Sequence, residues 1–171
     1  MKFTPLLTLA IKTDGTLWAW GQNQGNGPGI LGVNSQTLFS SPVQVGTLTN
    51  WASVSASRYT AHAVKTDGTL WGWGGNNGVN TFGSVGNNSS TSSFSSPVQI
   101  GTLTNWSSTW SGQDHFMAIK TDGTLWGWGL NSSGQLGTGD QNNRSSPTQI
   151  GQANTWTKIG GGQAHTIALK T

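Results

Sequence analysis

A repeated heptapeptide restricts the fold of this chain more than any other feature. Lys-Thr-Asp-Gly-Thr-Leu-Trp begins at Lys12, Lys65 and Lys120, and Lys170-Thr171 are the first two residues of a fourth copy. From Lys to Lys, the copies are 53, 55 and 50 residues apart. A period of this length is typical of solenoids, propellers and arrays, in which each repeat is one supersecondary unit. We therefore expect one repeat domain over 1–171, with repeats at approximately 12–64, 65–119 and 120–169 and a terminal strand, 170–171, that begins a fourth.

The repeats differ in length in one segment only. Pro42, Pro97 and Pro147 each precede the next repeat's Lys by 23 residues. The distance from the second Trp of Trp-x-Trp to this Pro varies, at 22, 24 and 19 positions in successive repeats. Since insertions in repeat proteins map to loops on one face, we expect these loops to share a face. The loop over 74–94, rich in Asn and Ser, is either a partner-binding surface or a tolerated insertion.

The composition favours strands over helices. Hydrophobic residues make up 33% of the chain and include ten Trp, which is enough to build a core. Glu is absent, and Gly, Ser, Thr and Asn fill the stretches between short apolar runs. Short apolar runs joined by such turn residues are typical of β-structure. The predicted fold class is all-β.

The third repeat shows how one unit is built. Residues 115–120 and 124–128 are predicted strands joined by a tight turn at Asp122-Gly123, because Gly adopts positive φ without a Cβ clash. Trp126 and Trp128 share one face, and Gly127 on the other face would let another sheet approach closely. Two further strands per repeat, as around 43–45 and 51–55, would give four. Four antiparallel strands form one propeller blade.

Several longer segments resemble the repeat of a known family. They are His165-Thr-Ile-Ala-Leu, Asp122-Gly-Thr-Leu-Trp-Gly-Trp-Gly-Leu-Asn131, Gly134-Gln-Leu-Gly-Thr-Gly139 and Pro147-Thr-Gln-Ile150. They are similar to the repeat of the regulator of chromosome condensation (RCC1) family. The resemblance implies four-stranded blades that close into a ring and bind proteins through the rims of the disc. No residue here matches the nucleotide-exchange site of that family, so this activity is not expected.

The number of repeats is the main departure from that family. About three blades cannot close a propeller, for which about four is the practical minimum. The open edges would invite association. Two chains could close a ring of about six blades, copies could stack, the chain could dock on a larger assembly, or it could be a piece of a longer protein. Four copies of the Ala-x-Lys strand against three Trp-x-Trp strands suggest strand exchange between chains.

Protein-contact candidates are the residues that depart from the repeat. Nine of the ten Trp occupy repeat positions and are expected in the blade cores. Trp110 instead stands where the other repeats have Ser or Gly, and Arg58 and Tyr59 replace Gln113 and Asp114 of the next repeat. Aromatic and Arg side chains are favoured as anchors at protein interfaces. The candidates are therefore Trp110, Arg58, Tyr59 and Asp114, and the alternative for Trp110 is local packing over a loop.

Catalytic and metal chemistry receive little support. Cys is absent, and the three His do not occur at a close metal-binding spacing. Of five Asp, three belong to the repeated turn, which leaves Asp114 and Asp140. Without Glu, a paired-carboxylate site is hard to assemble. The sequence therefore predicts no enzyme, no catalytic residue, no metal site and no cofactor.

Charge and hydropathy narrow the partners. The net charge of +3 comes from scattered residues rather than a basic patch, so nucleic-acid binding is not expected. No apolar run is long enough to span a bilayer, so no membrane partner is expected. Residues 2–11 imitate a signal peptide, but 7–12 align with 165–170, and Pro5 and the missing small-residue cleavage site further favour a repeat strand.

These observations favour a non-catalytic structural or protein-interaction module. It would assemble with copies of itself or decorate a larger assembly, such as a virion or an extracellular surface. The alternative is a soluble recognition protein that binds a protein or a glycan through the variable loops. Clustering of Trp110, Arg58 and Tyr59 on one rim would favour this alternative. An enzyme or exchange factor would need convergent polar residues in one pocket.

Overall fold

The computed structural model describes residues 7–23, 29–75 and 82–171, which form thirteen strands. The strands are β1 (Leu7–Ile11), β2 (Leu17–Gly21), β3 (Phe39–Gln44), β4 (Trp51–Ala56), β5 (Thr60–Lys65), β6 (Leu70–Gly74), β7 (Phe94–Gln99), β8 (Trp106–Ser111), β9 (His115–Lys120), β10 (Leu125–Gly129), β11 (Arg144–Gln149), β12 (Trp156–Gly161) and β13 (Thr166–Lys170). Within the described residues, no helix has the length and apolarity to cross a membrane. The predicted all-β fold class is confirmed.

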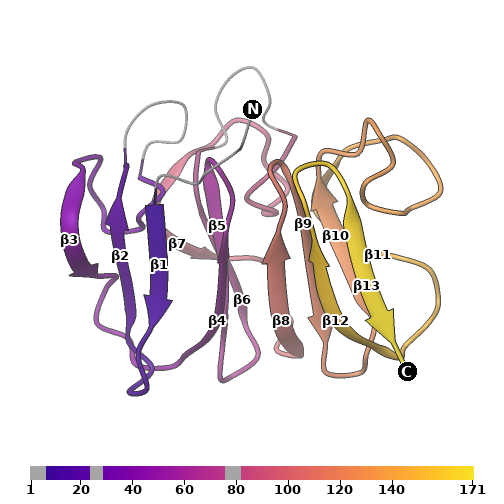
Figure 1. Ribbon diagram of the computed structural model, residues 1–171, viewed down its shortest axis with the longest axis horizontal. Helices are drawn as coiled ribbons and strands as arrows, with labels where there is room; N and C mark the ends of the chain where they lie inside the picture. The colour runs from indigo at the N-terminus through magenta and orange to yellow at the C-terminus, as the bar shows by residue number, and fades with distance from the viewer. Residues whose placement is uncertain (1–6, 24–28, 76–81) are drawn as a thin grey trace.

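The strands form four antiparallel sheets. Two are complete four-stranded blades, the second blade (β4-β5-β6-β7) and the third blade (β8-β9-β10-β11). The others are the first blade piece (β1-β2-β3) and the C-terminal hairpin (β12-β13). The sheets stand side by side in chain order along the long axis, and they do not close into a ring (Figure 1).

The blades are offset from the sequence repeats. Each complete blade begins with the strand that starts at Trp51 or Trp106, and the strand that ends in Lys65 or Lys120 is its second strand. One Lys-to-Lys repeat therefore supplies the last part of one blade and the first part of the next. The two kinds of unit have four strands each, but each blade joins strands from two successive repeats.

The repeated heptapeptide builds the turn between the second and third strand of a blade. Asp67 Oδ1 accepts hydrogen bonds from Thr69 N at 3.0 Å and Thr69 Oγ1 at 2.6 Å. The same Thr69 Oγ1 accepts one from Trp71 Nε1 at 2.8 Å. Gly68 has φ +76°, which an L-residue rarely adopts. The hydrogen bonds from Thr69 lower the pKa of Asp67. The heptapeptide is thus a hydrogen-bonded turn unit.

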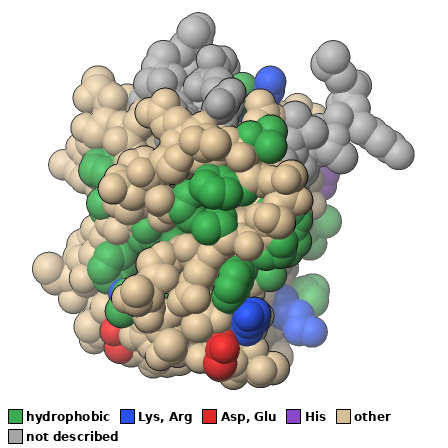
Figure 2. Space-filling view, turned by 90° about the vertical axis from the view of Figure 1, so that its left-hand side faces the viewer, with side chains coloured by type: hydrophobic (Ala, Val, Ile, Leu, Met, Phe, Trp, Pro, Cys, Tyr) green, Lys and Arg blue, Asp and Glu red, His purple; other side chains and the backbone are tan. Residues whose placement is uncertain are grey.

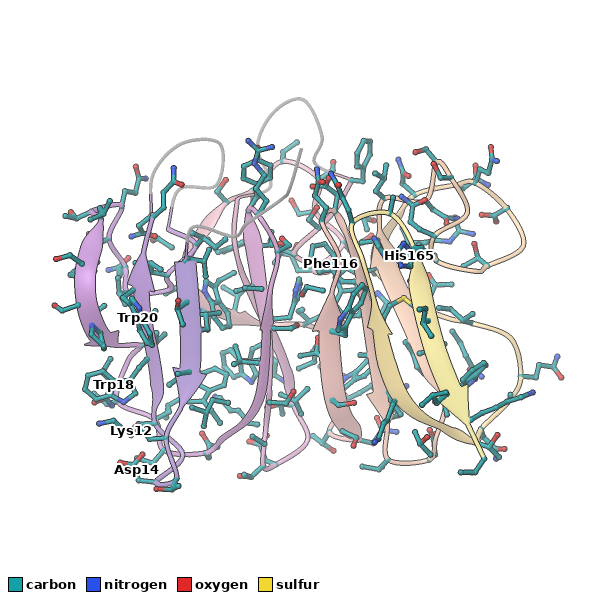
Figure 3. All side chains as sticks on the ribbon, viewed as in Figure 1. Lys12, Asp14, Trp18, Trp20, Phe116 and His165 are labelled. Carbon is teal, nitrogen blue, oxygen red and sulfur yellow. The ribbon has the colours of Figure 1, made fainter. Side chains whose placement is uncertain are left out.

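The same turn unit occurs in the first blade piece and in the third blade, with the same bonding pattern. In Figure 3, Lys12 and Asp14 lie at the lower end of the first blade piece, and Trp18 and Trp20 lie above them. The turn at Asp122-Gly123 was correctly predicted as a tight hairpin, since β9 pairs with β10 across it.

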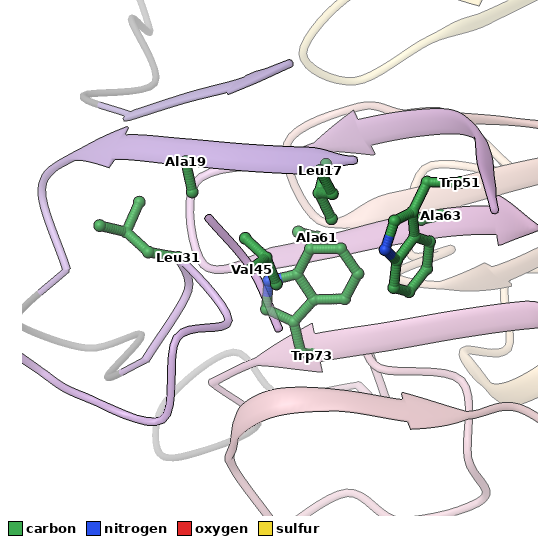
Figure 4. Packing of buried hydrophobic residues seen from close by; sticks show 8 residues of the cluster. All are labelled: Leu17, Ala19, Leu31, Val45, Trp51, Ala61, Ala63 and Trp73. Atoms are coloured by element: carbon green, nitrogen blue, oxygen red, sulfur yellow. The ribbon is translucent and has the colours of Figure 1, made fainter. Parts of the chain in front are cut away.

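The core lies between the sheets. In the first cluster, Leu17, Ala19, Leu31 and Val45 of the first blade piece pack against Trp51, Ala61, Ala63 and Trp73 of the second blade (Figure 4). The second cluster joins the second and third blades, and its members are Val64, Leu70, Ile100, Trp106, Phe116, Ala118 and Trp128. The third cluster (Met117, Ile119, Leu125, Leu136 and Ile150) lies on the third blade, and Trp156, Ile159 and Ala168 of the C-terminal hairpin pack against it. Each sheet therefore depends on its neighbour for burial.

The small residue between the two Trp of Trp-x-Trp has a different role from the predicted one. A Cβ on Gly72 would lie 2.7 Å from the carbonyl oxygen of Val85 and 2.9 Å from Ile100 Cδ1. Both atoms belong to segments that flank the fourth strand of the same blade. Gly127 is likewise surrounded by its own blade, since an added Cβ would lie 2.9 Å from Ile150 Cδ1 and 3.0 Å from Met117 Sδ. The prediction that another sheet approaches Gly127 was therefore wrong, because residues of the same blade fill the space.

The variable loops lie at one end of the blades. In Figure 1, the described loop residues 29–38, 82–93 and 130–143 are at the upper end, and the heptapeptide turns are at the lower end. The prediction that the loops share a face is confirmed for these residues. Part of the 74–94 loop and residues 1–6, with Pro5, lie outside the described residues. The predicted strand over 7–12 is confirmed as β1.

Candidate interaction surfaces

Three of the four predicted contact residues meet on the upper rim, where the first and second strands of each complete blade are joined. The guanidinium of Arg58 lies 4.9 Å from the ring centroid of Tyr59, and its side chain is exposed. Burial raises the pKa of Asp114, while a hydrogen bond from Gln113 and the positive charge of Arg58 oppose the rise. Arg58, Tyr59 and Asp114 thus form one patch across the second and third blades.

A further contact extends this rim to the C-terminal hairpin. Gln163 Nε2 donates a hydrogen bond to Gln113 Oε1. These two residues occupy the repeat position that Arg58 holds in the second blade. The rim is therefore one polar row in which a single repeat position contributes Arg58, Gln113 and Gln163.

Trp110 lies apart from this patch. It is half-buried and packs on the third cluster together with Trp156 of the C-terminal hairpin. A Cβ added to Gly161 would lie 3.0 Å from its ring. The ring of His115 is 5.5 Å away, at 60°. Trp110 therefore fills the seam between the third blade and the hairpin, which agrees with the packing alternative, and its contact role remains a prediction.

The buried histidines serve the same seams. His62 lies between the second and third blades, 4.5 Å from the ring of Phe116 and 5.1 Å from that of Trp128. Burial lowers its pKa to about 4. Burial, together with the charge of His165, likewise lowers the pKa of His115 to about 4. Both rings are neutral near pH 7 and closed off from solvent, which suits packing rather than proton transfer to a substrate.

An open hollow of about 470 Å³ lies between the third blade and the C-terminal hairpin, at the lower end. Lys120 and Asp122 line it. The ammonium of Lys120 lies 3.6 Å from the ring centroid of Trp126, and the carboxylate of Asp122 accepts two hydrogen bonds from Thr124. Both charged groups are thus engaged in the turn. Across the described residues, no group of three or more metal-ligating side chains could hold a metal ion.

A knob-and-socket contact joins successive blades, and the sequence did not reveal it. Trp73 and Trp128 are 0% exposed, and each inserts its indole into a loop of the preceding sheet. Trp73 Nε1 donates to the carbonyl oxygen of Ile30 at 2.8 Å, and Trp128 Nε1 donates to that of Ser84 at 3.1 Å. The sockets are residues 30–32 and 84–86.

The last residue of each socket must be small. A Cβ on Gly32 or Gly86 would lie 2.8 Å from the indole nitrogen of the inserted Trp. The signal in the sequence was the final Gly of three equivalent loop segments, Gly29-Ile-Leu-Gly32, Gly83-Ser-Val-Gly86 and Gly134-Gln-Leu-Gly137, because the two residues before this Gly differ between repeats. The third loop has the equivalent residues 135–137, which end in Gly137.

The two ends of the row expose the faces that are buried elsewhere. Ile167 and Leu169 on β13 are 59% and 58% exposed, while Met117 and Ile119 at the same positions of β9 are 1% and 4% exposed. At the other end, Figure 2 shows hydrophobic side chains in a band across the outer face of the first blade piece. Trp20 is partly exposed there, and no acceptor for its indole N–H is found within the described residues.

Comparisons with known proteins agree with this geometry. The family model of the regulator of chromosome condensation (RCC1) repeat matches residues 122–169. The chain is 31% identical over 145 residues to the RCC1 domain-containing protein RUG3, mitochondrial, of Arabidopsis thaliana, and the match covers 80% of this chain and 31% of that protein.

Solved structures show the same fold. Human WBSCR16 superposes with a TM-score of 0.79 at 20% identity, over 96% of this chain and 42% of that one. Prp20p of Saccharomyces cerevisiae, described with its binding properties to Gsp1p and histones, gives a TM-score of 0.75 at 19% identity over the same shares. The chain spans about a third or less of the curated relatives and about two fifths of these solved chains. It is an RCC1-like repeat protein, with the blades of an RCC1-like β-propeller in an unclosed row.

Proposed function

We propose that this chain is a non-catalytic protein-interaction module that assembles with copies of itself or attaches to a larger assembly. The observation that carries the proposal is the pair of uncovered apolar faces at the two ends of the row. A chain with only 8% charged residues and many Ser, Thr and Asn would suit a virion or an extracellular surface. Protein binding by a protein of this fold, as described for Prp20p, supports the interaction role.

The energetics favour covering these faces. Fully burying an Ile or Leu side chain contributes about 1.5–3 kcal/mol. Ile167 and Leu169 stand more than half exposed beside an unpaired edge of β13. At the other end, no described strand pairs with the outer edge of β1. An edge with free backbone donors and acceptors next to apolar side chains is a template for another strand.

The test is the solution mass of the chain, measured by light scattering over a range of concentrations. We expect a species near twice the chain mass of 17.9 kDa, or larger, that dissociates on dilution. A well-folded chain that stays at 17.9 kDa at every concentration would contradict self-assembly. Attachment to another protein would then be the part of the proposal left standing.

The upper-rim patch supports a second candidate, recognition of a protein or glycan. An exposed Arg stacked on Tyr beside a half-buried carboxylate resembles the anchors that dominate protein interfaces. The test is selection from a displayed peptide library, in parallel with a glycan array. Ligands that bind the wild type and Arg144→Ala but are lost with Arg58→Ala would support the patch. Arg144 is a suitable control because it pairs with Asp140 in its own loop, 2.7 Å away. Equal binding by all three would exclude the patch.

A further inference from the structure

The two ends of the row carry complementary parts of one blade. In a complete blade the second strand ends in Lys65 or Lys120, between a Trp-leading strand and a Trp-x-Trp strand. The first blade piece has strands equivalent to the second, third and fourth, and the C-terminal hairpin has those equivalent to the first and second. Among the described strands, the second strand of a blade is the one present at both ends, as β1 and as β13.

β1 carries the residues with which β13 contacts the third blade. Thr166 Oγ1 donates to the carbonyl oxygen of Gln135 at 2.9 Å and lies 3.1 Å from His115 Nε2. Ala168, two residues later, packs on the third cluster. β1 has Thr8 and Ala10 at these two positions. At the position of this Thr, the two complete blades have Ala61 and Phe116. β1 and β13 therefore share a residue that the complete blades lack, and in this structure β13 uses it to contact the third blade.

In each complete blade, a lysine lies between two Trp rings, and the two ends of the row each hold one part of this arrangement. In the second blade, Lys65 Nζ lies 3.6 Å from the ring centroid of Trp71 and 4.9 Å from that of Trp51. The third blade repeats this Trp–Lys–Trp sandwich at 3.6 and 4.8 Å.

At the ends of the row, each lysine lies near one Trp ring instead of two. Among the described Trp rings, Lys12 Nζ lies near that of Trp18, at 3.9 Å, and Lys170 Nζ near that of Trp156, at 5.8 Å. Lys12 therefore needs a Trp from a preceding first strand, and Trp156 begins such a strand.

The knob and the socket form a third divided pair. Trp20 is a knob whose indole is partly exposed. Residues 135–137 are a socket, and Gly137 has φ +73° as its counterparts have +76° and +86°. Around a Cβ added to Gly137, the nearest heavy atom is Ile150 Cγ2 at 3.7 Å, so the space that an indole occupies beside Gly32 and Gly86 is open.

We propose that two copies of this chain exchange strands head to tail, with β1 of one copy replacing β13 of the other. β12 of one copy and β1, β2 and β3 of the next then form one four-stranded blade. Lys12 enters a sandwich between Trp18 and the second copy's Trp156, and Trp20 enters the second copy's 135–137 socket. The inference rests on the proposed self-assembly and specifies its partner and its surfaces.

The number of copies follows from the blade count. Each chain then contributes about three blades, so two copies give a ring of about six, within the typical range of 4–8. One copy gives too few, and three would exceed the range. The two junctions of the ring are identical and heterologous, and the rotation closes after two copies. Displacing β13 costs little, since Ile167 and Leu169 are exposed in the hairpin and β1 restores the Thr and Ala contacts.

A reversible disulfide lock tests the exchange. Gly160 and Ile167 face each other across β12 and β13, and the chain has no Cys of its own. A Cβ on Gly160 meets no atom within 4 Å. Gly160→Cys with Ile167→Cys would hold β13 in place when oxidised. We expect the oxidised variant to lose dimerisation, with at least a tenfold weaker association, and a reductant to restore it.

The converse pair tests the exchanged state directly. Leu9 occupies the repeat position of Ile167, so exchange places Leu9 of one copy opposite the second copy's Gly160. Gly160→Cys with Leu9→Cys should yield a covalent dimer under mild oxidation, and neither single variant should do so. A pair that cross-links no better than the single variants would overturn the exchange.

The outcomes separate the two proposals. A wild-type chain that is monomeric at every concentration would overturn self-assembly and this inference together. A wild type that dimerises while the oxidised Gly160→Cys/Ile167→Cys variant dimerises equally would overturn only the strand exchange. Loss of association in the locked form with recovery on reduction would support both.

Discussion

The inner and terminal parts of this molecule share a repeat but not an environment. Trp73 and Trp128 are buried and hydrogen-bonded to the preceding sheet, whereas Trp20 at the same repeat position is partly exposed. Met117 and Ile119 are buried, whereas Ile167 and Leu169 are more than half exposed. The difference is the presence or absence of a neighbouring sheet. Burial in this chain is therefore a property of a pair of blades.

The hydrogen bonds of the heptapeptide turn are the same in the inner and terminal parts of the molecule. The bond from Thr Oγ1 to Asp Oδ1 in the heptapeptide turn measures 2.6 Å in the first blade piece and in both complete blades. The turn is formed by residues close in sequence, so a missing neighbour leaves it unchanged. In such repeat architectures, stability is approximately the sum of intrinsic repeat terms and nearest-neighbour interface terms. We expect the interface terms to dominate here.

The largest expected effect compares a seated knob with an unseated one. Trp128→Ala removes a buried indole from the seam between the second and third blades and should cost about 3–5 kcal/mol. Trp20→Ala should cost about 1 kcal/mol or less in a chain kept below its association concentration, because its indole is partly exposed. Urea unfolding, followed by Trp fluorescence and circular dichroism, measures both. Equal losses of unfolding free energy for the two variants would contradict the conclusion that burial of this Trp depends on a neighbouring sheet.

A pH titration tests the same seam through His62. Because its pKa is about 4 in the folded chain and 6.5 as the reference value, the folded state excludes a proton that the unfolded state binds below pH 6.5. The associated stability is fully present above pH 6.5 and is lost as the pH falls toward 4. At ~1.4 kcal/mol per pKa unit, the loss is roughly 3 kcal/mol.

The control for this titration is provided by the repeat itself. His62→Met introduces the residue that the third blade has at the same position, Met117. The variant should lose less stability than the wild type between pH 7 and 4.5, in urea unfolding at each pH. His115 remains in the variant and should retain part of the pH dependence, since burial also lowers its pKa. An unchanged pH profile would show that His62 does not exclude a proton in the folded state.

Two glycines with similar backbones separate backbone strain from contact. Gly86 and Gly137 have φ +86° and +73°, so Ala at either position carries a comparable strain of about 1–2 kcal/mol. Only at Gly86 would the new Cβ lie 2.8 Å from the indole nitrogen of Trp128. Gly86→Ala should therefore cost about 1–3 kcal/mol more than Gly137→Ala in the monomer. Equal decreases in melting temperature for the two variants would show that contact with Trp128 is not the reason for glycine at position 86.

The sequence predicted the features that are local. The Asp122-Gly123 turn, the strands on either side of it and the common face of the variable loops follow from spacing and turn chemistry, which involve neighbours along the chain. The prediction that the four strands of one repeat form one blade was wrong, because each blade joins strands of two successive repeats. Long-range packing decides that the Trp-leading strand pairs with the Lys strand that follows it and not with the strand that precedes it.

The contact residues show the same limit. Arg58, Tyr59 and Asp114 were chosen because they depart from the repeat, and the structure brings them together on the upper rim. Trp110 was chosen on the same ground but lies in a seam, because small residues of the C-terminal hairpin leave room for its ring. A departure from periodicity identifies a residue with an unusual environment. Whether that environment is solvent or a neighbouring sheet depends on residues about fifty positions away.

The smallest expected effect concerns the Trp–Lys–Trp sandwich. Lys120 is 6% exposed and lies 3.6 and 4.8 Å from two Trp rings, whereas Lys170 is exposed and 5.8 Å from one. A cation over a desolvated ring contributes up to ~2 kcal/mol, but the burial that lowers the pKa of Lys120 offsets part of it. Lys120→Met keeps an apolar side chain and removes the charge, so it should cost about 1 kcal/mol, and Lys170→Met about 0.5 kcal/mol or less. Urea unfolding of the two variants gives the difference. A larger loss for Lys170→Met than for Lys120→Met would show that Lys170 lies between two Trp rings in solution. That result would contradict strand exchange, because the exchange displaces β13 and moves Lys170 away from Trp156.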